Sequence, residues 1–157
     1  MPNPLWQFIA KVSTLLAIVR GVDRIAMASY KLEVDQSQDF IHCIADGDLE
    51  VKDLSVIAMA LFELGQVTGI TCYFIDFCKA HNKANPFQTY DFVHVDLNTM
   101  DQPDVGKAAL LTRQGDQSHN FLVTVMNNAC YRVQTFDEKA LALSWLLADK
   151  VTKEVLN

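Results

Sequence analysis

The chain has 157 residues, of which 50% are hydrophobic and 20% charged, and its formal net charge is −6. This length predicts one domain with a substantial hydrophobic core. The negative charge argues against nucleic acid or anionic lipid as the main partner, because both select a basic face. The four cysteines lie far apart without a Cys-x-x-Cys motif, which predicts reduced thiols in a cytoplasmic protein rather than a disulfide framework.

Residues 1–26 form a separate segment with the pattern of an amphipathic helix between Leu5 and Ile25. Its apolar side chains recur at spacings of three and four, and basic residues lie mainly between them. Lys11 argues against a secretory signal, and the uncharged run from Val12 to Val19 is too short to span a membrane. We expect this helix to dock on the domain or on a second copy in a homodimer. Peripheral contact with a membrane surface through residues 5–25 is the alternative.

The rest of the chain alternates between strand and helix patterns, which places a domain at residues 27–150 and a polar tail at 151–157. The first two strands flank a polar turn and form a hairpin, whereas each later strand is separated from the next by a helix, as in parallel sheets. The prediction is an α/β fold with a mixed sheet of about five strands and helices packed on it. The expected strands are 30–35, 40–45, 68–75, 105–112 and 131–136, and the expected helices are 50–65, 118–129 and 137–147.

Residues 87–97 fit two patterns. Phe87, Tyr90, Val93 and Leu97 have helical spacing, whereas Val93, Val95 and Leu97 also alternate as in a strand. A helix is favoured, because the connection between two parallel strands normally contains one.

This order of elements, together with local patterns in Tyr30–Leu147, resembles the STAS domain of anti-sigma factor antagonists, specifically the SpoIIAA-like (STAS/SEC14-like) group. The opening hairpin, the apolar strand that ends in Ile75-Asp76 and the apolar Lys107–Leu111 all match. The most specific match is the ending Val133–Leu146, with Phe, an acidic cap and Trp-Leu in order. The resemblance implies a SpoIIAA-like sheet and a domain that binds a protein partner or an apolar, lipid-like ligand.

One feature of that family is missing. Its phosphorylatable members carry Asp-Ser-Ser-Gly at the start of the helix after the central strand, a place that we assign here to Asp76–Ala80, where the chain has no serine or threonine. The resemblance therefore implies a non-catalytic binding domain without the phosphorylatable serine. A STAS-type antagonist that works by partner switching is the alternative.

The sequence contains no complete catalytic or metal-binding motif. His42 and Cys43 are adjacent in a predicted strand, so their side chains face opposite ways. Cys78 and His81 have only Asp76 nearby as a further metal ligand. We expect no metal and no cofactor, and a small enzyme with a Cys/His site is the least favoured alternative.

Aromatic side chains gather after the central strand, near the edge of the sheet where α/β domains usually bind ligands. A lid formed by residues 87–97 would cover an apolar pocket there. The predicted helix start at Ser118–Asn120 is either a simple cap or an anion site. The residues expected to line the pocket or lid are Tyr73, Asp76, Phe77, Phe87, Tyr90, Phe92, His119 and Phe121.

Overall fold

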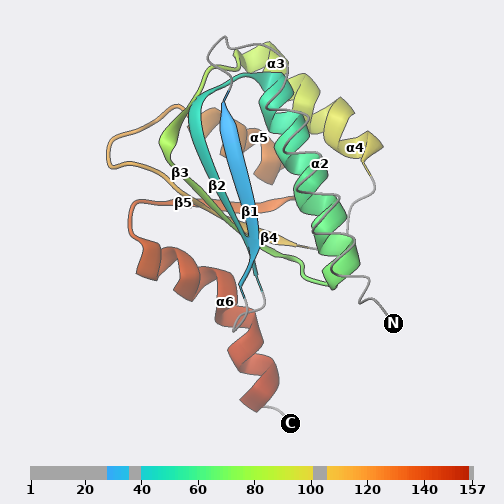
Figure 1. The fold of residues 1–157 in the computed structure, drawn as a ribbon, viewed down its shortest axis with the longest axis vertical. Helices are drawn as coiled ribbons and strands as arrows, with labels where there is room; N and C mark the ends of the chain where they lie inside the picture. Colours follow the sequence, from blue (N-terminus) through green and yellow to red (C-terminus); the bar gives the residue numbers. More distant parts are fainter. Residues whose placement is uncertain (1–27, 36–39, 101–105, 156–157) are drawn as a thin grey trace.

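The computed structural model describes residues 28–35, 40–100 and 106–155, and these form a five-stranded sheet with helices on both faces (Figure 1). The strand order is β1-β2-β3-β4-β5, in which β1 and β2 are antiparallel and the later strands add in parallel. The predicted α/β fold with a mixed sheet is confirmed. The strands are β1 (Ser29–Val34), β2 (Ile41–Leu49), β3 (Cys72–Asn82), β4 (Lys107–Leu111) and β5 (Arg132–Phe136).

The helices divide unequally between the two faces. In the described part of the chain, α2, the α3–α4 segment and α5 pack on one face, and α6 covers β3, β4 and β5 on the other (Figure 1). The helices are α2 (Val51–Thr68), α3 (Pro86–Asp91), the π-helical turn η1 (Phe92–Asp96), α4 (Leu97–Thr99), α5 (Asn120–Asn128) and α6 (Lys139–Val155). The helix predicted at 87–97 is confirmed, and it contains a π-helical turn.

The central strand β3 is buried on both faces, as its apolar sequence predicts. Tyr73, Ile75 and Phe77 join the core beneath α2, α3 and α5, whereas Cys72 and Phe74 join the core beneath α6. Because successive side chains of a strand point to opposite faces, one apolar run supplies both cores.

The strand predicted at 68–75 is displaced, since β3 runs from Cys72 to Asn82. Its second half pairs with Asp46–Leu49 of β2, after an irregularity in register between Ile44 and Asp46. β2, which was predicted to end at residue 45, continues to Leu49, and Gly47 adopts a φ of 104° inside the strand, close to Ala28. A glycine tolerates this backbone conformation, so it need not terminate pairing.

Helix α2 continues past Gly65, where the pattern suggested its end. Gly65 is buried within the helix, and Gly69, with a φ of 72°, forms the C-cap. A β-carbon on Gly65 would lie 2.5 Å from the Tyr73 hydroxyl oxygen. Gly65 is therefore accounted for by close packing on β3 rather than by helix termination.

The predicted helix Leu5–Ile25, and with it the division between residues 1–26 and 27–150, lies outside the described residues. At the other end, α6 extends to Val155, into the segment predicted as a polar tail. None of the helices described here is long and apolar enough to cross a membrane.

Candidate functional site

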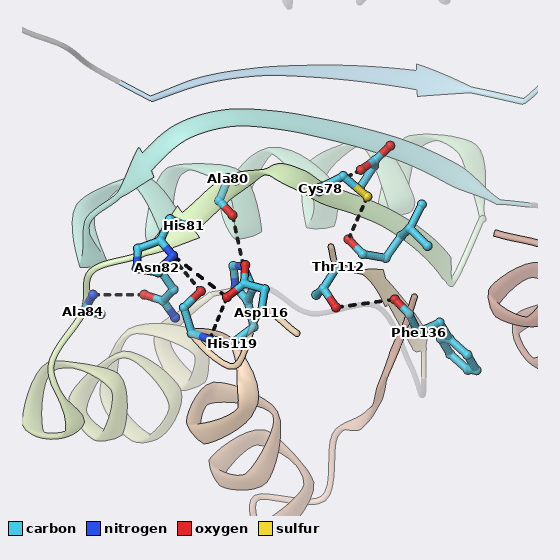
Figure 2. A network of polar contacts seen from close by, with 12 residues as sticks. Cys78, Ala80, His81, Asn82, Ala84, Thr112, Asp116, His119 and Phe136 are labelled. Atoms are coloured by element: carbon cyan, nitrogen blue, oxygen red, sulfur yellow. Dashed lines mark hydrogen bonds and ion pairs between the residues drawn. The ribbon is translucent and has the colours of Figure 1, made fainter. Parts of the chain in front are cut away.

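Polar side chains gather where β3 and β4 end, at the edge of the sheet where parallel α/β domains usually place ligands (Figure 2). We call this group the polar cluster. It consists of His81, Asn82, Asp116, Ser118 and His119.

Hydrogen bonds within the polar cluster connect the segment after β4 to the end of β3. The Ser118 backbone N–H donates to Asp116 Oδ1 at 2.9 Å, and the Asn82 N–H donates to the Ser118 hydroxyl oxygen at 3.1 Å. Asn82 Oδ1 in turn accepts from the Ala84 N–H at 2.9 Å (Figure 2). These bonds fix the chain just before α3 and just before α5.

His119 is fully buried beneath this network. Its ring stacks on Phe77 with 4.8 Å between centroids, and its Nε2 lies 3.3 Å from the Ala80 carbonyl oxygen. Burial lowers the pKa of His119 below the usual imidazole value, and the hydrogen bond to Ala80 and the charge of Asp116 only partly oppose this. The imidazole is therefore neutral at pH 7.

Asp116 lies between two imidazoles, with Oδ1 3.9 Å from His81 Nδ1 and Oδ2 3.7 Å from His119 Nε2. Burial alone would raise the pKa of Asp116, but the hydrogen bonds from the backbone and side chain of Ser118, followed by electrostatic interactions with His119 and His81, outweigh it, so the pKa is lowered. Both imidazole distances exceed the 2.6–3.2 Å, roughly, over which a catalytic base accepts a proton. The hydrogen bonds of Asp116 and Ser118 hold the segment before α5 against the end of β3.

Two of the four cysteine thiols, those of Cys43 and Cys78, are poorly suited to nucleophilic chemistry. Burial and the nearby Asp76 raise the pKa of Cys78 to about 11, and burial together with Asp76 raises that of Cys43 to about 12. Because the thiolate is the reactive form, neither thiol is activated at neutral pH. Within the described ranges, no group of three or more His, Cys, Asp or Glu side chains is arranged to hold a metal ion.

A second feature is the outer side of α3. Asn85 accepts a hydrogen bond from the Gln88 N–H at 2.8 Å, and the Gln88 side chain accepts from the Asn85 N–H at 3.0 Å, which makes a capping box in front of Pro86. Phe87 is 74% exposed and Tyr90 is 55% exposed. The Tyr90 ring lies 4.1 Å from that of His94, which follows one turn later. We call Phe87, Tyr90 and His94 the α3 aromatic face.

The inner side of this helical segment packs into the core. Thr89, Phe92, Val93 and Leu97 are each at most 4% exposed. The helical segment is therefore capped at its start and buried along one side, so the exposed rings of Phe87 and Tyr90 are attached to a rigid backbone.

The eight residues expected to form a pocket or lid do not converge. Phe77 and His119 are in contact, and both belong to the buried interior with Tyr73 and Phe92. Asp76 lies within β3, where Oδ1 accepts from the Cys78 N–H at 2.9 Å. Their assignment to ligand binding stays a prediction. The exposed members are Phe87, Tyr90 and Phe121.

A groove that the sequence did not indicate lies between α2 and the η1–α4 turn, with a volume of about 420 Å³. Ser55 donates to Asp96 Oδ2 at 3.1 Å across it, between positions 41 residues apart. Helical periodicity indicates which side chains of a helix face away from the core, but it does not indicate which other helix lies beside them. The sequence pattern therefore could not locate this groove. Its lining residues are Ser55, Met59, Phe62, Glu63, Gln66, Asp96, Thr99 and Met100.

The assignment of Asp76–Ala80 to the start of the helix after the central strand is wrong, because these residues lie within β3. That helix begins at Pro86 with Asn85 as its N-cap. The new position also lacks serine, and the first threonine after it, Thr89, is 1% exposed.

No protein-family model and no curated protein matches the chain. One similar solved structure is an uncharacterised protein with a SpoIIAA-like fold from Shewanella loihica, 18% identical, with a TM-score of 0.49 over 79% of this chain and 97% of that one. Another is an anti-sigma factor antagonist from Mycobacterium paratuberculosis, 8% identical, with a TM-score of 0.50 over 76% of this chain and 94% of that one. The latter likeness shows the fold alone, and the chain therefore has the SpoIIAA-like (STAS) fold that the resemblance predicted.

Proposed function

We propose that this SpoIIAA-like domain is a non-catalytic cytoplasmic protein that binds a protein partner through the α3 aromatic face. The observation that carries the proposal is the exposure of Phe87, at 74%, and Tyr90, at 55%, on one short capped helix. Aromatic rings dominate the binding energy of protein interfaces, because each buries a large area and loses little conformational entropy.

Rigidity of the support favours the same function. The capping box of Asn85 and Gln88 and the buried Phe92 and Val93 hold α3 in place before any partner arrives. A preorganised surface loses less conformational entropy on binding, so more of the contact energy appears as affinity.

An anti-sigma factor antagonist has the same fold, and a partner-switching antagonist is the second candidate. We propose that partner binding here is not switched by serine phosphorylation. The support is that the helix start reads Asn85-Pro86-Phe87-Gln88, and that the adjacent Thr89 hydroxyl is buried out of reach of a kinase.

An apolar, lipid-like ligand is the third candidate, and the groove beside α2 is the cavity to hold it. Its lining places the carboxylates of Glu63 and Asp96 beside the apolar side chains, and a free lipid without a basic group would leave these carboxylates unpaired. Native mass spectrometry of the protein purified from cells separates the readings: a co-purifying lipophile, or uptake of a fatty-acid probe, would favour this candidate over partner binding.

The test of partner binding is affinity capture from lysate with the full chain, compared by quantitative mass spectrometry between the wild type, the Phe87→Ala/Tyr90→Ala variant and Leu141→Ala. Leu141 is 55% exposed on α6, across the sheet, and therefore matches Tyr90 in exposure. We expect a partner that the double variant loses and the control retains. Identical captured proteins for all three would contradict the role of the α3 aromatic face.

A homodimer is a separate part of this proposal, and it does not specify which residues form the interface. Light scattering over a range of protein concentrations measures it directly. A mass that stays at that of one chain would remove the homodimer while leaving the partner-binding face untouched.

A further inference from the structure

We propose that the groove between α2 and the η1–α4 turn is the docking site for the N-terminal amphipathic segment Leu5–Ile25 of the same chain. The inference does not depend on partner binding, because the groove and the α3 aromatic face share no residue.

The groove offers apolar side chains between acidic ones. Met59 is 54% exposed on α2, and Phe62 and Met100 line the groove with it. Glu63 and Asp96 place carboxylates in the same lining. Such a surface suits a helix that has an apolar stripe and basic residues beside it.

The N-terminal segment has that pattern. Lys11, Arg20 and Arg24 are three of the 13 basic residues, and Asp23 is one of the 19 acidic ones, so residues 1–26 carry a net charge of +2 and the remainder of the chain carries −8. Opposite charges on two parts of one chain favour their association, most strongly at low salt. The apolar positions of the predicted stripe are Leu5, Phe8, Ile9, Val12, Leu15, Leu16, Val19 and Val22.

The position of Ala28 makes the groove reachable. Ala28 lies beside Gly47, four residues before α2 begins, and packs on the core that α2 covers. A 21-residue helix would be ~31 Å long and the 18-residue α2 is ~27 Å long, at ~1.5 Å per residue. The segment is thus long enough to run back along the whole of α2 from the point where β1 starts.

Hydrogen–deuterium exchange on the full chain tests the docking. We expect slowed exchange of the amides in residues 5–25 in the wild type, and exchange about tenfold faster in Met59→Glu, which puts a charge against the apolar stripe. Glu63→Lys should also accelerate exchange, because it sets like charges together. The matched controls lie on the other face of the sheet: Leu141→Glu on α6, at 55% exposure against 54% for Met59, and Glu138→Lys, one residue before α6 begins.

The amides of β3 serve as the internal reference, since a variant that unfolds would accelerate them as well. Unprotected residues 5–25 in the wild type, or protection that Met59→Glu and Leu141→Glu alter equally, would overturn the proposal. Protection that disappears on dilution together with a fall in mass would instead assign the groove to a second copy. Protection that arises only with phosphatidylglycerol vesicles would assign the segment to a membrane surface, and either result refutes docking within one chain.

Discussion

Tyr73 provides the most direct test of how α2 packs on the sheet. The side chain is 5% exposed, its ring packs edge-on against Phe62 at 6.2 Å, and its hydroxyl is buried without a hydrogen-bond partner among the described residues. A buried polar group without a partner costs ~1–3 kcal/mol. Tyr73→Phe keeps the ring and removes the hydroxyl, so we expect the free energy of unfolding to rise by about 1 kcal/mol and Tm by about 2–4 °C.

The same hydroxyl explains why α2 carries a glycine at position 65. An alanine β-carbon there would lie 2.5 Å from Tyr73 Oη and 2.9 Å from the Ile70 carbonyl oxygen. The gain in helix propensity of ~1 kcal/mol is therefore opposed by overlap in the wild type. In the Tyr73→Phe background the closest contact is gone, and Gly65→Ala should cost at least ~1 kcal/mol less than it does alone.

Gly69→Ala is the control for this double-mutant cycle. Gly69 has a φ of 72° and nothing within 4 Å of an added β-carbon, so its replacement strains the backbone by ~1–2 kcal/mol without touching Tyr73. Urea unfolding monitored by circular dichroism gives the midpoint and slope for each variant. A destabilised Tyr73→Phe, or equal costs of Gly65→Ala in both backgrounds, would refute the packing argument.

Three further predictions concern other parts of the fold. Burial lowers the pKa of His119 in the folded protein, so the unfolded chain binds a proton at a higher pH than the folded chain does. The free energy of unfolding should therefore fall as the pH drops from about 6.5, the ordinary imidazole pKa, towards the lower pKa of the folded state. His119→Gln should flatten this dependence in urea titrations between pH 8 and pH 5. Asn127 donates to the Val133 carbonyl at 2.8 Å and accepts from the Val133 N–H at 3.1 Å, so Asn127→Ala should lower stability by about 1–2 kcal/mol in chemical denaturation. Leu146 lies on the buried face of α6 and is 1% exposed, so Leu146→Ala should lower the free energy of unfolding by about 2–5 kcal/mol, whereas Leu141→Ala, at an exposed position of α6, should change it by no more than about 0.5 kcal/mol. Similar melting temperatures for the two variants would show that the buried face of α6 is wrongly assigned.

Local patterns in the sequence were sufficient to predict the order of strands and helices. Apolar residues alternate over Tyr30–Val34 and form a continuous run around Phe74. Each pattern indicates which side chains of one strand face the core, and it can be recognised within a few residues. The helix at 87–97 was predicted in the same way, but its spacing put Phe87 and Tyr90 on one face with Val93 and Leu97, whereas the structure exposes the first two residues and buries the last two. These features, with the ending Val133–Leu146, led to the SpoIIAA-like fold.

The candidate site depended on contacts between distant segments. His119 is buried because Phe77 of β3 stacks on it, and Ser55 meets Asp96 only because α2 and the η1–α4 turn lie side by side. No local period carries such information, which is why the polar cluster and the groove were not predicted as units.

The sequence by itself determined the order and type of the strands and helices, because backbone propensity and the alternation of apolar side chains act over one or two turns. The tertiary structure decided where elements end. β3 reaches Asn82 because the second half of β2 offers it hydrogen-bond partners. Gly65 does not end α2, because this glycine makes room for Tyr73, and the helix ends at Gly69. Both outcomes follow from strand pairing and side-chain packing between segments that are distant in the sequence, and these interactions outweigh the local tendency of glycine to end a strand or a helix.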